Sequence, residues 1–116
     1  MHLSLTRDPF DTLIVILRDG DVETTVSARP SSAALRSLSG VVDDAGRDGY
    51  GECFWPGADG GQYWWIVKRD ESAAEVVVMW TRGGVAIWEH VFRATDAFSW
   101  IRDHLDREMA RIAPTA

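Results

Sequence analysis

The sequence has a single cysteine, Cys53, in 116 residues. This excludes a fold held by disulfide bonds, because small secreted domains of that kind carry even sets of cysteines. The longest apolar run, residues 13–17, is far shorter than the roughly 20 residues that span a membrane. Arg7 and Asp8 stand where a secretory signal peptide would place its apolar stretch. We therefore expect a cytoplasmic protein with no membrane partner.

Positive charge is also scarce. Eighteen acidic residues stand against twelve basic ones, and the formal net charge is −6. Proteins that bind the nucleic-acid backbone normally present a basic face, so we expect no nucleic-acid partner. No group of residues has the spacing of a zinc site, a calcium loop, a phosphate-binding loop or a nucleophile elbow. We expect no metal and no cofactor, and a binding protein rather than an enzyme. Cys53 is expected to be a small buried apolar residue of a strand.

Tryptophan, in contrast, is abundant: six of the 116 residues, about 5%, are tryptophan. Tryptophan is enriched at the hot spots of protein interfaces. The length suits a single domain over residues 1–116. A chain of this size buries enough surface to fold without disulfides or metals.

The pattern of apolar residues predicts both strands and helices. One helix is expected to begin at a capping residue, Ser31 or Ser32, and to stop at Gly46. Its apolar stripe is expected to consist of Ala34, Leu35, Leu38, Val41, Val42 and Ala45. A second is expected from about Asp96 to Ile112, with an apolar stripe of Phe98, Ile101, Leu105, Met109 and Ile112. The remaining elements are strands over residues 12–18, 21–28, 50–55, 62–69, 74–82 and 85–93, and a short strand before residue 9.

This order, β-β-(β)-α-β-β-β-β-α, predicts the fold class. We expect a single α+β domain with an antiparallel, strongly curved sheet of five to seven strands and two helices packed on it. The turn between the first two long strands is predicted at Asp19-Gly20, because Asp-Gly supplies the positive φ angles of a type I′ turn. That turn sets Leu17 opposite Val22 on the buried face.

The last hairpin is apolar on both faces. A two-residue turn at Gly83-Gly84 predicts that Trp80 lies opposite Ile87 and Val78 opposite Glu89 on one face. The other face then consists of the pairs Met79–Trp88, Val77–His90 and Glu75–Phe92. The preceding strand is apolar on both faces too, with Trp64 and Ile66 on one, and Tyr63, Trp65 and Val67 on the other. A sheet with one face in water alternates apolar and polar residues, so something must cover the second face.

The candidate binding residues fall on two surfaces. The first is the sheet face of Trp64, Trp80 and Ile87, and the second is the side of the last helix that carries Trp100. Contiguous apolar patches of more than a few hundred Å² mark interaction sites. The candidates on these surfaces are Trp64, Trp80, Ile87, Glu89, Trp100, His104 and Arg107, and Trp88 is a further candidate on the other face of the same sheet.

The function that these features favour is a protein-binding or regulatory module. Acidic residues near the sheet would steer a basic partner toward it; they are Glu52, Asp59, Asp70 and Glu71. By architecture, a small acidic α+β protein with exposed aromatic residues is similar to bacterial toxin-neutralising immunity proteins and other small inhibitors. That resemblance implies a rigid, acidic, aromatic-containing surface that occludes a basic one.

Two alternatives remain open. One is a small-molecule-binding domain, or a minor enzyme, whose pocket is walled by tryptophan and Tyr63 and carries Glu89 or His90 as its polar group. The other is a homodimer in which two copies share the apolar sheet face.

Overall fold

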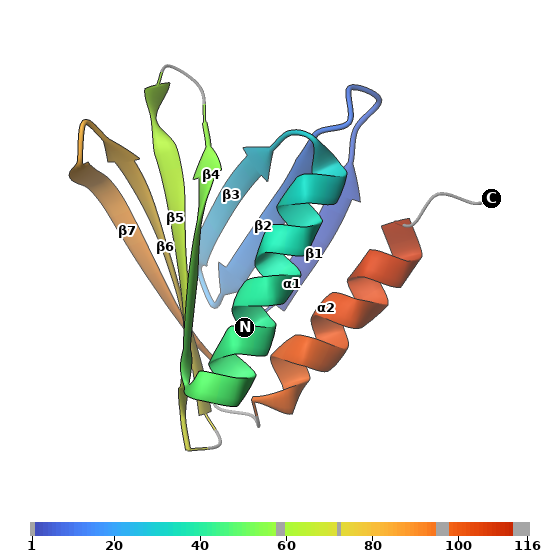
Figure 1. The fold of residues 1–116 in the computed structure, drawn as a ribbon, viewed down its shortest axis with the longest axis vertical. Coiled ribbons are helices and arrows are strands. Elements are labelled where there is room, and N and C mark those ends of the chain that lie inside the picture. The colour runs from blue at the N-terminus through green and yellow to red at the C-terminus, as the bar shows by residue number, and fades with distance from the viewer. Residues whose placement is uncertain (1, 58–59, 72, 95–97, 113–116) are drawn as a thin grey trace.

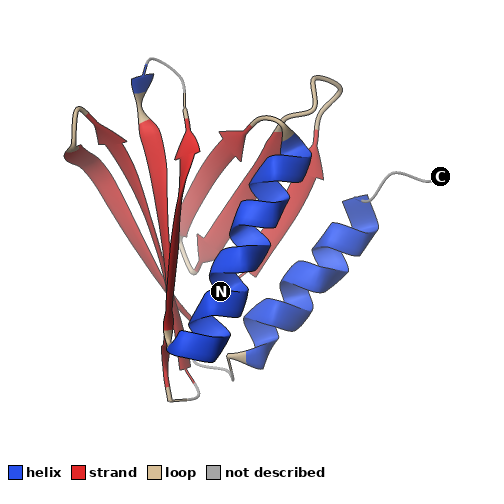
Figure 2. Ribbon diagram, viewed as in Figure 1, coloured by secondary structure: helices blue, strands red, loops and turns tan. Residues whose placement is uncertain are grey.

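The computed structural model describes residues 2–57, 60–71, 73–94 and 98–112. Within these residues the chain forms seven strands and two helices (Figures 1 and 2). In chain order they are β1 (His2–Arg7), β2 (Leu13–Asp19), β3 (Val22–Ala28), α1 (Ser31–Asp48), β4 (Tyr50–Pro56), β5 (Gln62–Asp70), β6 (Ala73–Arg82), β7 (Val85–Ala94) and α2 (Ser99–Ile112). The α+β class and the predicted order of elements are confirmed.

The strands form two antiparallel sheets rather than the one curved sheet that the sequence predicts. One has the order β1-β2-β3 and the other the order β4-β5-β6-β7. Helix α1 leads from the first sheet to the second and lies in the opening between them, while α2 lies beside β1 (Figure 1). This division gives each sheet one apolar face that it buries in a shared core.

The core is built from the inner faces of both sheets and the apolar stripes of both helices. Its largest fully buried side chains are Trp55, Trp65 and Phe92, and the ring centroids of the two tryptophans lie 5.0 Å apart. The stripe of α1 is buried as predicted, apart from the partly buried Leu35. In α2, Ile101 and Leu105 are buried, and the other residues of the predicted stripe pack against the same core.

The turn of the first hairpin consists of Gly20 and Asp21, one residue further along than predicted. Gly20 has a φ of +61°, which suits the first central position of a type II′ turn. Leu17 therefore pairs with Thr24 rather than with Val22. Because the shift is an even number of residues, the predicted inner face of the hairpin stays inside and only its last residue, Val22, becomes exposed.

Helix α1 continues past Gly46, where the sequence predicts its end, and stops at Gly49. Gly49 has a φ of +84° and donates its N–H to the carbonyl of Ala45, as a C-terminal glycine cap does. Gly46 has a packing role instead, because a Cβ at this position would lie 3.2 Å from the ring of Phe98. Because Gly46 has no side chain, Phe98, which directly precedes α2, can pack against α1.

The N-terminus of α1 also differs from the prediction. Pro30 precedes the helix, and no side chain caps it. Ser31 is the first helical residue and is buried; its hydroxyl donates to the carboxylate of Asp11, and its N–H donates to the carbonyl of Asp11 at 2.9 Å. The predicted start of α2 near Asp96 lies outside the described residues, and α2 is described from Ser99.

The last hairpin has the predicted turn but not the predicted register. Gly83 and Gly84 both have positive φ angles, and the first two pairs beside the turn follow the prediction. A register shift between Trp80 and Thr81 then leaves Ile87 as an extra residue, so that Trp80 pairs with Trp88. Every pair beyond this bulge is moved by one residue, which exchanges the faces of β7.

Among the described residues, neither helix combines the length and the apolar character needed to cross a membrane.

Candidate functional site

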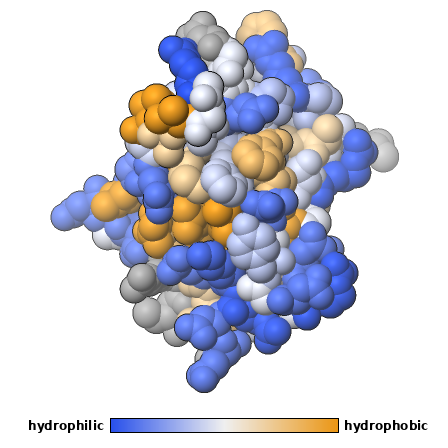
Figure 3. Space-filling view, turned by 60° about the vertical axis from the view of Figure 1, so that its left-hand side comes forward, coloured by the Kyte–Doolittle hydropathy of each residue, from blue (hydrophilic) through white to orange (hydrophobic). Residues whose placement is uncertain are grey.

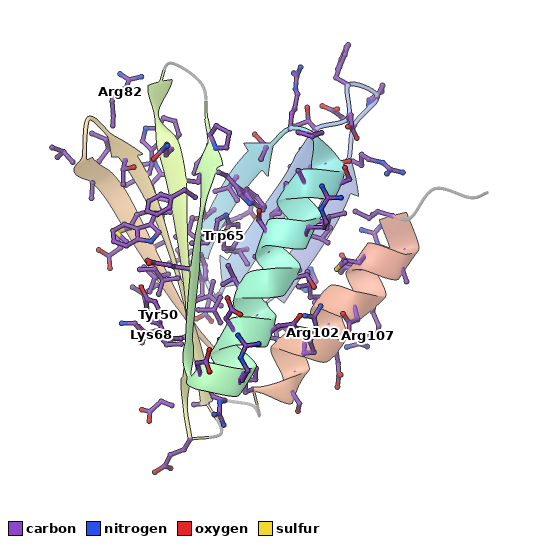
Figure 4. All side chains as sticks on the ribbon, in the orientation of Figure 1. Tyr50, Trp65, Lys68, Arg82, Arg102 and Arg107 are labelled. Carbon is purple, nitrogen blue, oxygen red and sulfur yellow. The ribbon has the colours of Figure 1, made fainter. Side chains whose placement is uncertain are left out.

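The outer face of the four-stranded sheet is an apolar surface that neither described helix covers. Both helices lie on the inner side, where α1 packs against β4 and β5. Figure 4 shows Trp65 pointing toward α1, whereas Tyr50 and Lys68 point the other way. Figure 3 shows apolar side chains gathered on this outer face, with polar side chains around them. We call this surface the outer face; its side chains include Tyr50, Glu52, Phe54, Trp64, Ile66, Lys68, Glu75, Val77, Met79, Glu89 and Val91.

The centre of the outer face is a small apolar cluster separate from the main core. Ile66, Val77 and Met79 come from β5 and β6 and are at most 9% exposed, because their neighbours on the sheet enclose them. Trp64 packs against this cluster. On β7, Val91 pairs with Val77 and is 44% exposed. The apolar surface therefore extends from the enclosed cluster to solvent-exposed residues at the edge.

The β4 side of the outer face holds one carboxylate between three aromatic rings. Tyr50, Glu52 and Phe54 alternate along β4, and Trp64 lies opposite Phe54 on β5. The Tyr50 hydroxyl donates to Oε2 of Glu52 at 2.8 Å, and Nε1 of Trp64 donates to the same oxygen at 2.9 Å. The rings of Phe54 and Trp64 stack with their centroids 5.3 Å apart. The hydrogen bond to Glu52 raises the pKa of Tyr50.

A shallow hollow of about 190 Å³ lies beside the aromatic rings of Phe54 and Trp64. Phe54 and Trp64 form one wall, and the turn at Gly83 and Gly84 contributes to the rim. It is large enough for an apolar side chain of another protein, and smaller than the sites of about 300 Å³ or more that enclose drug-sized ligands.

The bulge in β7 changes the partners of several candidate residues. Glu89 pairs with Met79 and lies on the outer face, so the predicted face shared by Glu89, Trp80 and Val78 is wrong. Glu89 is exposed there. Trp64 and Ile66 do share a face, as predicted, and β6 adds Met79 rather than Trp80 to it.

Trp80 and Trp88 lie together on the inner side of the four-stranded sheet. Trp80 is 4.7 Å from the ring of Tyr63 and packs on the turn after β4, where a Cβ on Gly57 or Gly61 would come within 2.3 Å of its indole. Glycine at positions 57 and 61 therefore leaves the space that the Trp80 indole occupies. Both tryptophans are half-buried, so they contribute to the fold rather than to an open surface.

His90 also lies on this inner side, half-buried against Trp88, with their ring centroids 4.9 Å apart. The pocket that the sequence suggests would need Glu89 or His90 beside the tryptophans and Tyr63. Only His90 lies with them, because the bulge turns Glu89 away.

The second predicted surface, on α2, is engaged in packing. Trp100 stacks on His104 with ring centroids 4.7 Å apart and 12° between the planes, and it packs against the main core. Both residues are half-buried, and Arg107 is exposed further along the helix (Figure 4).

Side chains of α2 form hydrogen bonds with backbone N–H and C=O groups along the edge of β1 that no strand covers. Nε2 of His104 donates to the carbonyl of Leu3 at 2.7 Å. Oε1 of Glu108 accepts the N–H of Leu5 at 3.1 Å, and Arg111 donates to the carbonyl of Leu5. Covering an edge strand in this way protects it from pairing with another chain. The polar groups of this helix face therefore have a structural role.

Cys53 lies on the inner face of β4 and is partly buried. Desolvation raises the pKa of its thiol to about 12. A thiol with so high a pKa is almost entirely protonated near neutral pH, which makes it a poor nucleophile. This agrees with its interpretation as a small apolar residue.

Sequence reasoning identified Trp64, Glu89 and Glu52 but not the arrangement around Glu52. Tyr50 and Phe54 were not among the candidates, although their alternation with Glu52 along a predicted strand places all three on one face. Of the other acidic candidates, Asp70 and Glu71 lie at the β5–β6 turn, and Asp59 lies outside the described residues.

No protein-family model, no curated protein and no solved structure matches this chain.

Proposed function

We propose that this chain is a cytoplasmic protein-binding module, of the inhibitor or immunity type, that binds a basic partner protein through the outer face. The observation that carries the proposal is the exposed apolar surface beside the enclosed centre of that face, where Phe54 is 50% and Val91 is 44% exposed and no described helix covers them. Exposed apolar surface on one sheet face is typical of a protein interface. The aromatic residues on its β4 side, Tyr50, Phe54 and Trp64, are of the type that dominates binding energies at protein interfaces.

Charge supports a basic partner. Glu52 and Glu89 carry negative charge on the outer face, Lys68 is a basic residue described there, and the whole chain has a net charge of −6. Complementary charge accelerates association and selects partners of the opposite sign. The α2 surface is a weaker candidate, because His104 and Glu108 already bind the edge of β1.

The experiment uses two valine-to-lysine variants with matched exposure. Val91→Lys places a positive charge on the outer face, where Val91 is 44% exposed, and Val22→Lys places one on the three-stranded sheet, where Val22 is 46% exposed. Wild type and both variants are immobilised and exposed to a lysate of the source cells. Any captured protein is purified, and its affinity for wild type and for each variant is then measured. Light scattering at two concentrations reports self-association of the same samples.

We expect a captured protein with a basic surface that binds wild type and the Val22→Lys variant equally and the Val91→Lys variant at least about tenfold more weakly. Equal binding by both variants, or no captured protein that distinguishes them, would refute the proposal. A wild-type dimer that Val91→Lys dissociates would also refute it, because a second copy of the chain would then cover the outer face.

A further inference from the structure

We infer that Glu52, with Tyr50, Phe54 and Trp64 around it, forms a binding site for an arginine side chain of the partner. This inference rests on the proposed function and adds the chemistry by which the outer face recognises its partner. The carboxylate supplies a fixed negative charge, and the aromatic rings supply flat surfaces beside it.

The carboxylate of Glu52 is held in place before any ligand arrives. Tyr50 and Trp64 both donate to Oε2, at 2.8 and 2.9 Å, so the side chain has little rotational freedom left to lose on binding. Since both bonds end on Oε2, the other oxygen, Oε1, takes no part in them. Oε1 carries part of the carboxylate charge and is held at a fixed position, where it can accept a hydrogen bond from a cationic N–H donor.

The surroundings favour a guanidinium group over other cations. Tyr50 and Phe54 flank Glu52 along β4 and are 43% and 50% exposed, so aromatic surface is accessible on both sides of the carboxylate. A guanidinium group is planar and weakly hydrated, and it can bond to a carboxylate while it stacks on an aromatic ring. An ammonium group is compact and strongly hydrated, and it gains less from such a surface.

Lys68 is the basic residue described nearest to Glu52 on the outer face. It pairs with Tyr50 in the β4–β5 ladder and is therefore a diagonal neighbour of Glu52. The hydrogen bonds that Oε2 accepts come from the two aromatic side chains and not from the lysine. The site therefore remains chemically suited to a cation from outside the chain.

The test is an NMR titration with small probes that differ only at the side-chain tip. N-acetyl-arginine methylamide is compared with the citrulline analogue, which has nearly the same shape without the charge, and with the lysine analogue. The indole N–H signal of Trp64 reports binding, because that group donates directly to Glu52. Glu52→Gln keeps an oxygen acceptor for both hydrogen bonds and removes the charge. Glu23→Gln, at an exposed site on the three-stranded sheet, is the matched control.

We expect the arginine probe to shift the Trp64 indole signal in a saturable way, with a dissociation constant on the order of millimolar for so small a ligand. We expect Glu52→Gln to weaken binding by at least about tenfold and Glu23→Gln to leave it unchanged. An equal response to citrulline, an equal affinity for the lysine probe, or unchanged binding in Glu52→Gln would overturn the inference.

The two proposals can fail separately. If the captured partner loses affinity for Val91→Lys but binds Glu52→Gln as tightly as wild type, the outer face is the interface and the arginine site is wrong. If Val91→Lys binds the partner normally, the proposed function itself is wrong, whatever the arginine probe does.

Discussion

Helix α1 approaches β4 closely at Gly51, and this contact predicts the effect of a single methyl group. A Cβ on Gly51 would lie 2.2 Å from the carbonyl oxygen of Val41 and 3.0 Å from its carbonyl carbon. Both groups belong to the backbone, so no side-chain rotation can relieve the overlap. Because a carbon and an oxygen need about 3.2 Å, Gly51→Ala must separate α1 from β4 by about 1 Å.

The expected cost follows from the packing around this contact. Val41 and its neighbour Val42 are almost fully buried in the main core. Overpacking of such a site costs about 3 kcal/mol at the upper end of the usual range. Replacing glycine also restricts the unfolded chain, which returns about 1 kcal/mol. The free energy of unfolding should therefore fall by about 2 kcal/mol, and the Tm by about 8 °C.

Gly40→Ala in the same helix is the matched control, because a Cβ on Gly40 would meet no heavy atom within 4 Å. It should raise stability by about 0.5 to 1 kcal/mol through helix propensity alone. Urea unfolding followed by tryptophan fluorescence and circular dichroism measures both variants. A Gly51→Ala protein as stable as wild type would show that α1 does not lie against β4 as described.

Three further predictions concern single side chains. Burial raises the pKa of the Cys53 thiol to about 12, so at pH 9 it should react with iodoacetamide at least about a hundredfold more slowly in the native protein than in urea. Because the pKa is higher in the folded protein than in the unfolded chain, the free energy of unfolding should fall as the pH rises above about 9. The pKa of Glu108 is lowered by its bond to Arg111 and by the N–H of Leu5, so its contribution is present above its ordinary value of 4.5 and lost in more acidic solution. Glu108→Gln should therefore destabilise the protein at pH 7 in urea unfolding and differ little from wild type near pH 3. Trp80→Ala should lower the free energy of unfolding by about 3 kcal/mol, because it empties the space over the glycine turn.

Each of these predictions has a result that contradicts it. Rapid alkylation of native Cys53 would mean that β4 exposes its inner face to solvent. A constant difference in stability between wild type and Glu108→Gln from pH 3 to pH 7 would mean that the carboxylate is not linked to folding. An unchanged unfolding midpoint for Trp80→Ala would place this tryptophan on the surface.

The sequence by itself determined the local elements of this protein. Apolar periodicity located the strands and both helical stripes, and the two glycines at positions 83 and 84 fixed the last turn through their positive φ angles. The same alternation placed Trp64 and Ile66 on one face of β5. It also showed that the final strands are apolar on both faces, which is the origin of the outer face. These features depend on neighbouring residues only.

The tertiary structure decided which residues meet. The division into two sheets depends on how α1 packs between them, and Gly51, which has no side chain, allows the backbone of α1 to approach β4 closely. The bulge beside Trp80 moved Glu89 to the outer face and Trp88 to the inner one, a change of one residue that no local pattern announces. Likewise, the sequence predicted a binding surface at Trp100, whereas this tryptophan packs against the core and its helix binds the edge of β1. A period-2 pattern says that two faces exist, but only the packing of distant segments determines which of them is covered.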